Sequence, residues 1–536
     1  MPLSSEREVV RRLAEEGLNA SPDAVARIVG STDTEAVITE LVRRAHGPVV
    51  TRDDVRAVAE ASGGDDTGGP DETSSDDLPV SDPPDRPAGR DAGTSSGDTE
   101  TTRSDVGDAR TDGAVSPTEV PASDVSPEPG SGTSPTGPSS RNPSPVDVAN
   151  DITGESTCTG DYSDFVGYFR DRFDKLSSLL RSRIQPRTVD SAGSGGKDVA
   201  LVGMVNDVRT TSSDRDNRLV EIEDPTGEIR LLLSDVLVDV AETLVVDEVI
   251  GVEGRLSDDG GMVFVDEVHF PEVPPRREPT TASRDVKAVL ISDIHVGSDT
   301  FVRDHWELFA DWLSGRDDVE YLLVGGDMVE GVGVYPGQDD ELTTVDIYEQ
   351  YRECAEMFDA LPDDIEIVTI TGNHDTVRLA EPQPALDDRF REPFGDNVSF
   401  HGNPSVVTVE GVDVLMYHGM SLNPFAESLP HVEIESPETA MVEMLRKRHL
   451  APMYGDVRLA PEKEDYLVID DVPDVLHTGH THTVGAEKYR NVLTVNTGAW
   501  QAQTPYQKSM NIQPDVGYAA VLDLSTLELD LKQFEP

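Results

Sequence analysis

Three histidines lie close together near the end of the chain, in the segment HTGHTHT at residues 477–483. His477, His480 and His482 could bind a metal ion through their ring nitrogens, but a short histidine-rich loop could equally be solvated and inert. The chain has only twelve histidines among 536 residues, so this cluster needs a reason. Whether it forms a metal site depends on the other ligands that the fold brings to it.

Four more polar clusters occur upstream, and each comes directly after an apolar segment. The apolar segments VKAVLIS, YLLVGG, IEIVTIT and VDVLMY precede, in turn, Asp293 and His295, then Asp327, then Asn373, His374 and Asp375, and finally His418. In an α/β sheet, ligands gather at the carboxyl ends of the strands. Alone, each cluster is typical of a turn, a helix cap or a buried histidine. Five in succession predict one shared site.

The residue types in these clusters predict a centre for two metal ions. Carboxylate, amide and imidazole groups bind divalent ions such as Mn, Fe, Ni or Zn, and the lack of thiolates argues against a structural zinc. The set exceeds the needs of one ion but suits two ions that share a carboxylate. Two ions about 3.5 to 4 Å apart can bind a phosphate, activate a bridging water and stabilise the leaving oxygen. We therefore predict phosphoester hydrolysis.

The composition divides the chain into segments that would carry this site. Residues 285–536 alternate apolar strands with helical stretches, which predicts an α/β domain. Short alternating strands at 197–275 predict an OB-type barrel, and 156–190 has helical spacing. Residues 61–155 are rich in Asp, Ser, Gly and Pro and are predicted to be a disordered linker. Residues 1–60 carry helix-capping signals and predict a small helical domain for docking another protein. The fold class is thus multidomain α+β.

The barrel leaves two roles open. OB-type barrels often bind single-stranded nucleic acid by stacking bases on aromatic side chains, but this one offers few, Phe264 among them. A structural or subunit-contact role is at least as well supported.

The chain is strongly acidic, with 104 Asp plus Glu against 44 Lys plus Arg and a net charge of -60. Lysine is scarce, and we interpret this composition as an adaptation to molar salt, as in a halophilic archaeon, because such salt screens self-repulsion. Two cysteines are too few for a disulfide framework. Without a signal peptide or a membrane-length apolar run, we expect a soluble cytoplasmic protein that does not bind membranes.

The motif order D-x-H, G-D, G-N-H-D, H-G and G-H-x-H over residues 288–500 resembles the calcineurin-like metallophosphoesterases. The resemblance implies a four-layer α/β/β/α sandwich with two divalent ions, Mn above all, although Mg, Ni, Fe or Zn would also fit. It places Asp293, His295, Asp327 and His482 on the first ion, and Asp327 as the bridge, Asn373, His418 and His480 on the second.

The same resemblance assigns roles to the neighbouring residues. His374 would contact the scissile phosphate or protonate the leaving group, and Asp375 would orient His374. His477 matches no ligand of the family and is expected to be structural or to support a ligand. Glu330 stands where the break-repair nuclease of this superfamily has a histidine, so the chain departs from that protein.

A closer resemblance covers most of the chain. The domain order and the segment GGDMVEGVGVYPGQ at 325–338 resemble the small subunits of archaeal DNA polymerase D. That family implies a manganese-dependent 3′–5′ exonuclease that proofreads for a large catalytic subunit, with primer-template 3′ ends as substrate and a sliding clamp as a further partner. Two alternatives stay open, which are an idle scaffold or processivity subunit, and a stand-alone phosphatase or phosphodiesterase.

Overall fold

The computed structural model describes residues 141–536 except 157–161, 212–216 and 336, together with isolated positions among the first 60. The chain divides into two units, residues 1–136 and 137–536. In the first unit Asn19–Ala20 (β1) pairs in parallel with Val49–Val50 (β2). Most of the predicted helical domain, the predicted linker up to residue 140, and Cys158 lie outside the described residues.

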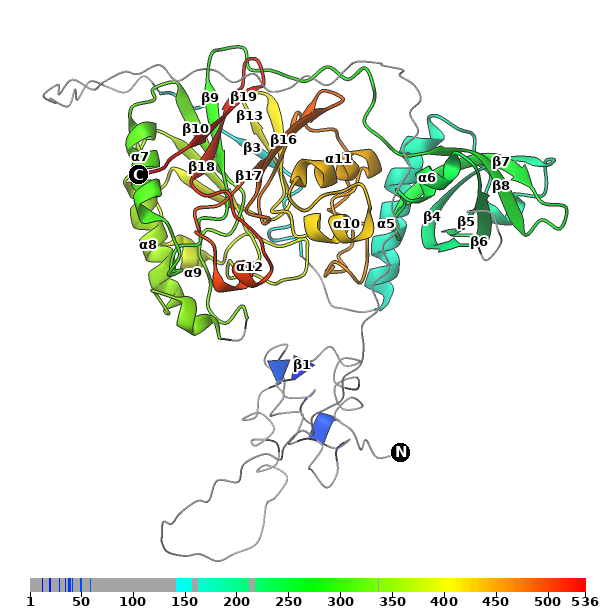
Figure 1. Ribbon diagram of the computed structural model, residues 1–536, viewed down its shortest axis with the longest axis horizontal. Coiled ribbons are helices and arrows are strands. Elements are labelled where there is room, and N and C mark those ends of the chain that lie inside the picture. Colours follow the sequence, from blue (N-terminus) through cyan, green and yellow to red (C-terminus); the bar gives the residue numbers. More distant parts are fainter. Residues whose placement is uncertain are drawn as a thin grey trace, which may run out of the picture. The chain divides into compact units, whose positions relative to one another are not determined.

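The first large sheet has six strands, with the order β12-β11-β10-β9-β18-β19 (Figure 1). Its parallel strands are β9 (Lys287–Ile291), β10 (Val319–Val324), β11 (Glu366–Ile370) and β12 (Val398–His401). Strand β18 (Tyr518–Asp523) pairs antiparallel with β9, and β19 (Glu528–Gln533) pairs antiparallel with β18. Every residue of β10 is buried, as expected for a parallel strand that is covered on both faces. The helices of this half are α7 (Arg303–Ser314), α8 (Ile347–Asp359), α9 (Asp388–Arg391) and α12 (Pro505–Ser509).

The second large sheet also has six strands, with the order β16-β17-β15-β14-β13-β3. They are β3 (Asp147–Ala149), β13 (Ser405–Val409), β14 (Val412–Met416), β15 (Val475–Thr478), β16 (Val484–Tyr489) and β17 (Val492–Thr497). Two helices, α10 (Leu422–Ser428) and α11 (Pro437–Lys447), belong to this half. Strand β3 corrects one expectation, because these residues fall within the predicted linker but pair with β13.

Alternate side chains of the strands form separate cores on the two faces of the first sheet. Val289 and Ile291 of β9 pack with residues of α7 and α8, whereas Ala288 and Leu290 pack with residues of the second sheet. The far face of the second sheet packs with residues of α10 and α11. The domain therefore has four layers, α/β/β/α, and the prediction of an α/β domain at the C-terminal end is confirmed.

A closed barrel of five strands precedes this domain, with the order β4-β5-β6-β8-β7. Its strands are β4 (Asp198–Thr210), β5 (Arg218–Asp224), β6 (Gly227–Leu233), β7 (Val249–Leu256) and β8 (Met262–His269), and a short helix, α6 (Leu237–Ala241), lies between β6 and β7. Helix α5 (Tyr162–Arg181) lies between the barrel and helices α10 and α11 (Figure 1). Among the described helices, none combines the length and apolarity that a membrane crossing requires.

Buried ion pairs join the barrel to the four-layer domain. Lys447 Nζ of α11 lies 3.1 Å from a carboxylate oxygen of Glu248, and both side chains are at most 1% exposed. Arg172 of α5 donates to Asp465 at 2.7 Å, to the carbonyl of Pro452 at 2.7 Å and to that of Asp247 at 3.2 Å. These contacts hold α5, the barrel and the four-layer domain together.

Candidate metal centre

The predicted ligands lie immediately after the ends of five parallel strands. Asp293 follows β9, Asp327 follows β10 and Asn373 follows β11 in the first sheet, while His418 follows β14 and His480 follows β15 in the second. Because the carboxyl ends of parallel strands share one edge of a sheet, these loops meet where the two sheets adjoin.

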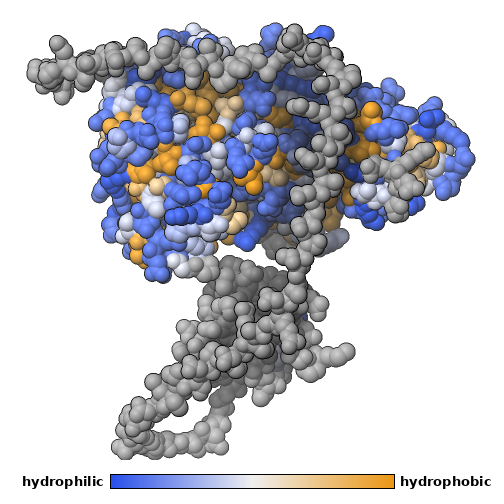
Figure 2. All heavy atoms as spheres, in the orientation of Figure 1, coloured by the Kyte–Doolittle hydropathy of each residue, from blue (hydrophilic) through white to orange (hydrophobic). Residues whose placement is uncertain are grey.

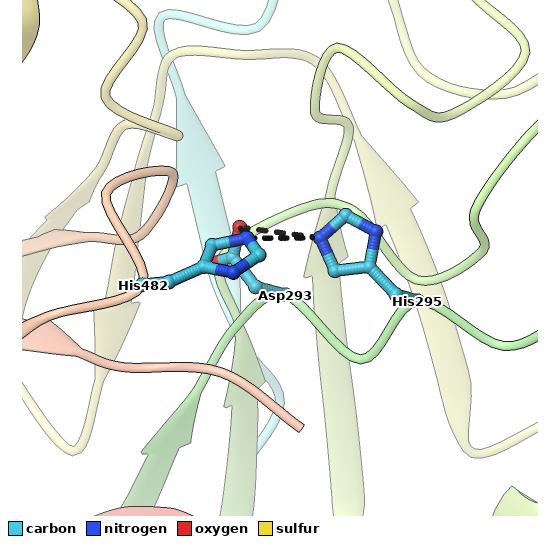
Figure 3. A group of neighbouring side chains, drawn as sticks. All are labelled: Asp293, His295 and His482. Atoms are coloured by element: carbon cyan, nitrogen blue, oxygen red, sulfur yellow. Dashed lines mark hydrogen bonds and ion pairs between the residues drawn. The ribbon is translucent and has the colours of Figure 1, made fainter. Parts of the chain in front are cut away.

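Asp293, His295 and His482 form one buried group (Figure 3). The Nε2 atoms of His295 and His482 lie 3.1 Å apart. Asp293 Oδ1 lies 3.4 Å from His482 Nε2 and 3.8 Å from His295 Nε2. Three potential ligand atoms therefore point toward one another, as they would around a single cation.

Asp327 connects this group to a second one. Its Oδ2 atom lies 3.9 Å from His295 Nε2 and 3.2 Å from His418 Nε2. His418 Nε2 lies in turn 3.0 Å from Asn373 Oδ1. The Asp327 carboxylate is thus within reach of both groups, which is the placement that a shared carboxylate requires.

His480 and His477, from the histidine cluster, lie differently. The backbone N–H of His480 donates to both carboxylate oxygens of Asp293, at 3.1 and 2.9 Å, and its ring lies 5.2 Å from that of His418. His477 lies within β15, fully buried, with Nε2 3.4 Å from Thr497 Oγ1. In the described part of the chain, the three-residue groups with converging ligand atoms include neither histidine.

His374 and Asp375 occupy distinct positions beside Asp327. The backbone N–H of His374 donates to Asp327 Oδ1 at 2.7 Å, and its Nδ1 lies 2.8 Å from the carbonyl oxygen of Glu330. Asp375 is buried and accepts from the backbone N–H groups of Asp327 and Gly372, at 3.0 and 2.9 Å. Asp375 therefore holds together the loops that carry Asp327 and His374, and its role in orienting the His374 ring stays a prediction.

Glu330 is buried among the same histidines. Its Oε2 lies 2.9 Å from His295 Nδ1 and accepts from Gln501 Nε2 at 2.8 Å, while Oε1 accepts from Gln338 Nε2 at 3.2 Å. A carboxylate behind a ligand histidine fixes the orientation of its ring and raises its basicity. Glu330 therefore supports His295 through its side chain and His374 through its backbone carbonyl.

The backbone around the site is held in a conformation that few residues adopt. Asp293, His295, Asp327, His480 and His482 all have φ between 52° and 70°. Such left-handed residues are uncommon outside glycine and gather at functional sites, where the surrounding structure maintains them.

One glycine is required by close approach as well. A Cβ atom at Gly326, which has a φ of 94°, would lie 2.7 Å from His418 Nδ1. The absence of a side chain at Gly326 therefore allows His418, which follows a strand of the second sheet, to pack against the backbone beside Asp327.

The charges of the site depend on one another. Burial acts to raise the pKa of Asp293, but hydrogen bonds with His295 and His482 hold that pKa well below its ordinary value. Burial acts to lower the pKa of His418, but the charge of Asp327 raises it to about 10. Burial and the neighbouring charge of Asp327 raise the pKa of Asp375 to about 7.

The donor set fits divalent cations. Asp293 and Asp327 are at most 1% exposed, and among the described residues their ion pairs are all with histidines, without a lysine or arginine. Buried carboxylates need compensating positive charge. Imidazole, carboxylate and amide ligands suit Mn, Fe, Ni or Zn. The geometry can therefore hold metal ions, and it leaves the identity of the metal open.

Several supporting residues escaped sequence reasoning. The sequence distinguishes Glu330 only as a departure from a related nuclease. It does not predict any role for Gln501 or Gln507. Gln507 Nε2, in α12, lies 2.9 Å from His482 Nδ1. The segment TPYQ at 504–507 does have the spacing of a capping box, which the structure contains. That signal could have located the helix, although not its contact with His482.

Comparisons with known proteins match one part of the chain to a phosphoesterase family and most of its length to polymerase small subunits. A family model described as calcineurin-like phosphoesterase matches residues 286–484. A DNA polymerase II small subunit of Halobacterium salinarum is 44% identical and covers 100% of both chains. Those of Archaeoglobus fulgidus and Pyrococcus furiosus are 43% and 36% identical, over 70% and 68% of this chain and 78% and 62% of theirs. A solved archaeal phosphodiesterase aligns with 46% of this chain and 99% of its own at 16% identity, with a TM-score of 0.24, too low to support an argument.

Proposed function

Because the chain belongs to the family of DNA polymerase II small subunits, as its sequence motifs predicted, we propose that its metal centre is a 3′–5′ exonuclease that removes nucleotides from primer ends. The observation that carries the proposal is the position of Asp327 Oδ2, within 3.9 Å of His295 Nε2 and 3.2 Å of His418 Nε2. A carboxylate between two ligand groups is what a pair of ions needs for phosphodiester hydrolysis.

We assign the ligands as the superfamily resemblance implies. Asp293, His295, Asp327 and His482 would hold one ion, and Asp327, Asn373, His418 and His480 the other. Two such ions, manganese being our choice, would bind the scissile phosphate and activate the attacking water. The assignment of His480 to the second ion is supported by its ring, which lies 5.2 Å from that of His418.

The chain's own residues would orient the phosphate and handle the proton. His374 Nδ1 is engaged by the Glu330 carbonyl, so Nε2 is the nitrogen available to the phosphate or the leaving oxygen. The side chain of His374 is 19% exposed. The other histidines that form ion pairs with Glu330, Asp293 or Asp327 are at most 8% exposed. It is therefore placed to meet a substrate while the buried ligands are not.

We further propose the assembly in which this chemistry would operate. The relatives are small subunits, so a large catalytic subunit is the expected partner, with primer-template DNA as the shared substrate and a sliding clamp as a further contact. The strand order β4-β5-β6-β8-β7, with a helix after the third strand, supports assignment of residues 197–275 as an OB-type barrel. We retain 1–60 as a docking domain and 285–536 as the exonuclease domain.

Replacing Asp327 with Ala tests the proposal. The variant should lose manganese-dependent removal of 3′ nucleotides from mismatched primer-template, because both ligand groups lose their shared carboxylate. Asp388→Ala is the matched control, since the Asp388 side chain is 98% exposed. Nuclease activity that survives Asp327→Ala would show that the site is assigned wrongly. No turnover by the wild type, alone or with the large subunit, would favour the scaffold alternative.

Salt gives a second test. Phosphate contacts to DNA weaken steeply as salt rises, and this chain carries a net charge of -60. We therefore expect tethering to the large subunit to supply most of the substrate's residence time in molar salt, through effective concentration. Equal exonuclease rates with and without the large subunit at high salt would contradict this expectation.

A further inference from the structure

Helix α12 (Figure 1) contacts the predicted ligand His482 through Gln507 and carries exposed side chains. Tyr506 is 63% exposed and Met510, just after the helix, is 58% exposed. Lys508, between them, is also exposed, and among the described residues no ion pair with it is formed. Figure 2 shows that the visible face of the described residues is largely hydrophilic with scattered apolar patches. Tyr506 and Met510 expose an aromatic ring and a thioether on either side of the lysine.

Another residue of the same short helix supports a predicted ligand. Gln507 Nε2 lies 2.9 Å from His482 Nδ1, so the helix lies against the residue whose Nε2 faces Asp293. The backbone N–H of Asp515, after the helix, donates to the His482 carbonyl at 2.7 Å. Gln507, the residue that contacts His482, is therefore the immediate neighbour of Tyr506 in the chain.

The exposure of Tyr506 is not the result of a loose segment. Thr504 and Gln507 form a complete capping box at the start of α12. Gln503 Nε2 donates to the carbonyl of Ile512 at 2.7 Å, and the N–H of Ala502 donates to that of Thr300 at 2.8 Å. The helix is held at both ends, so the Tyr506 ring is exposed on a fixed segment that contacts the site.

A second apolar residue lies on the His374 side of the centre. Val332 is 40% exposed, in the loop that starts at Gly331 and packs on the His374 backbone. The ring of His295 lies 4.8 Å from that of His374 and 4.9 Å from that of His482. A phosphate at the centre would therefore lie near both surfaces, and the groups attached to it would extend across them.

We propose that α12 contacts the 3′-terminal nucleotides of single-stranded DNA, with Tyr506 stacking on a base and Lys508 near a backbone phosphate. This inference rests on the proposed function and names the residues that hold the substrate. Base stacking on an aromatic ring is tolerant of sequence, as a proofreading site requires. It also depends little on counterion release, so it persists where salt suppresses phosphate contacts.

The test measures DNA binding without turnover. The full-length chain in EDTA is titrated with a single-stranded oligonucleotide that carries 2-aminopurine at its 3′ end, a base whose fluorescence falls when it stacks. Tyr506→Ala should weaken binding about 5- to 100-fold, the range expected for one base–aromatic stack, and abolish the fluorescence change. Tyr506→Phe should retain both. Tyr162→Ala, at a tyrosine that is 84% exposed at the start of α5, should bind like the wild type.

Each outcome bears on the proposal separately from the exonuclease assignment. Unchanged binding and quenching by Tyr506→Ala would overturn it, as would an equal loss in Tyr162→Ala. Unchanged DNA binding with weakened assembly with the large subunit would overturn it in favour of a protein contact. A chain that shows no nuclease activity but loses quenching in Tyr506→Ala would refute the exonuclease and support the stacking contact.

Discussion

Replacing Glu330 with Gln should weaken metal binding while leaving the size of the side chain unchanged. The carboxylate is surrounded by donors, with His295 Nδ1 and Gln501 Nε2 at 2.9 and 2.8 Å from Oε2 and Gln338 Nε2 at 3.2 Å from Oε1. An amide carries two donor hydrogens on its nitrogen. Whichever way the new Gln turns, it therefore places a donor against a donor.

The substitution should reduce both metal affinity and folding stability, because it changes the contact with His295 and leaves one buried donor without an acceptor. Removing the carboxylate behind a ligand histidine typically lowers metal affinity about 10- to 100-fold, or about 1.4 to 2.8 kcal/mol. Glu330 is 3% exposed, so a donor left without an acceptor there costs a further ~1 to 3 kcal/mol of folding free energy. We expect the Kd for Mn²⁺ to rise by that factor, and the metal-free variant to unfold at lower denaturant concentration.

The assay is a titration of Mn²⁺ with the full-length chain, following free manganese by electron paramagnetic resonance. Glu349→Gln is the matched control, because the Glu349 side chain lies on α8 and is 51% exposed. A Glu330→Gln protein that binds Mn²⁺ within about twofold of the wild type would refute the view that this carboxylate orients a ligand.

Three further outcomes are expected. Lys447→Met should cost about 3 to 5 kcal/mol in chemical unfolding, because it leaves Glu248 buried without its cation, whereas exposed Lys488→Met should cost far less; similar midpoints would contradict this. Burial and the charge of Arg172 lower the pKa of His449 to about 4, below the 6.5 of the unfolded chain, so stability should fall by about 3 kcal/mol as pH drops from 6.5 to 4. That fall, measured in urea, should shrink in His449→Gln, and an unaltered profile would argue against it. Removal of metal with EDTA should lower the melting temperature, because ions at 100 times their Kd add about 2.7 kcal/mol to the free energy of unfolding; no shift in melting temperature would count against bound ions.

The location of the candidate ligands could be predicted because it follows from a general property of parallel strands. Asp293, Asp327, Asn373 and His418 each come after a nearly unbroken apolar run, and such runs predict buried strands whose ends share an edge. The spacing of apolar residues also distinguished the predicted C-terminal α/β domain from the predicted barrel. These features depend on residues adjacent in sequence, so one chain suffices to see them.

Contacts between distant segments could not be predicted in this way. Strand β3 has three residues, too few for an alternating pattern, and it forms only because β13 offers an edge. Gln507 lies 25 residues from His482, and no local rule places its amide on that ring. The orientation of His480, whose backbone meets Asp293, likewise depends on the left-handed conformation of its loop.

The junction between the barrel and the four-layer domain bears on how a primer end would reach the exonuclease site that we propose. Lys447 and Arg172 are fully buried between them, and parting the two would break these ion pairs and uncover the apolar side of α5. Motion of the barrel against the four-layer domain would therefore have to break these contacts. In the exonuclease that we propose, a mispaired primer end would then reach the site by motion of the DNA itself, or of the barrel and the domain together.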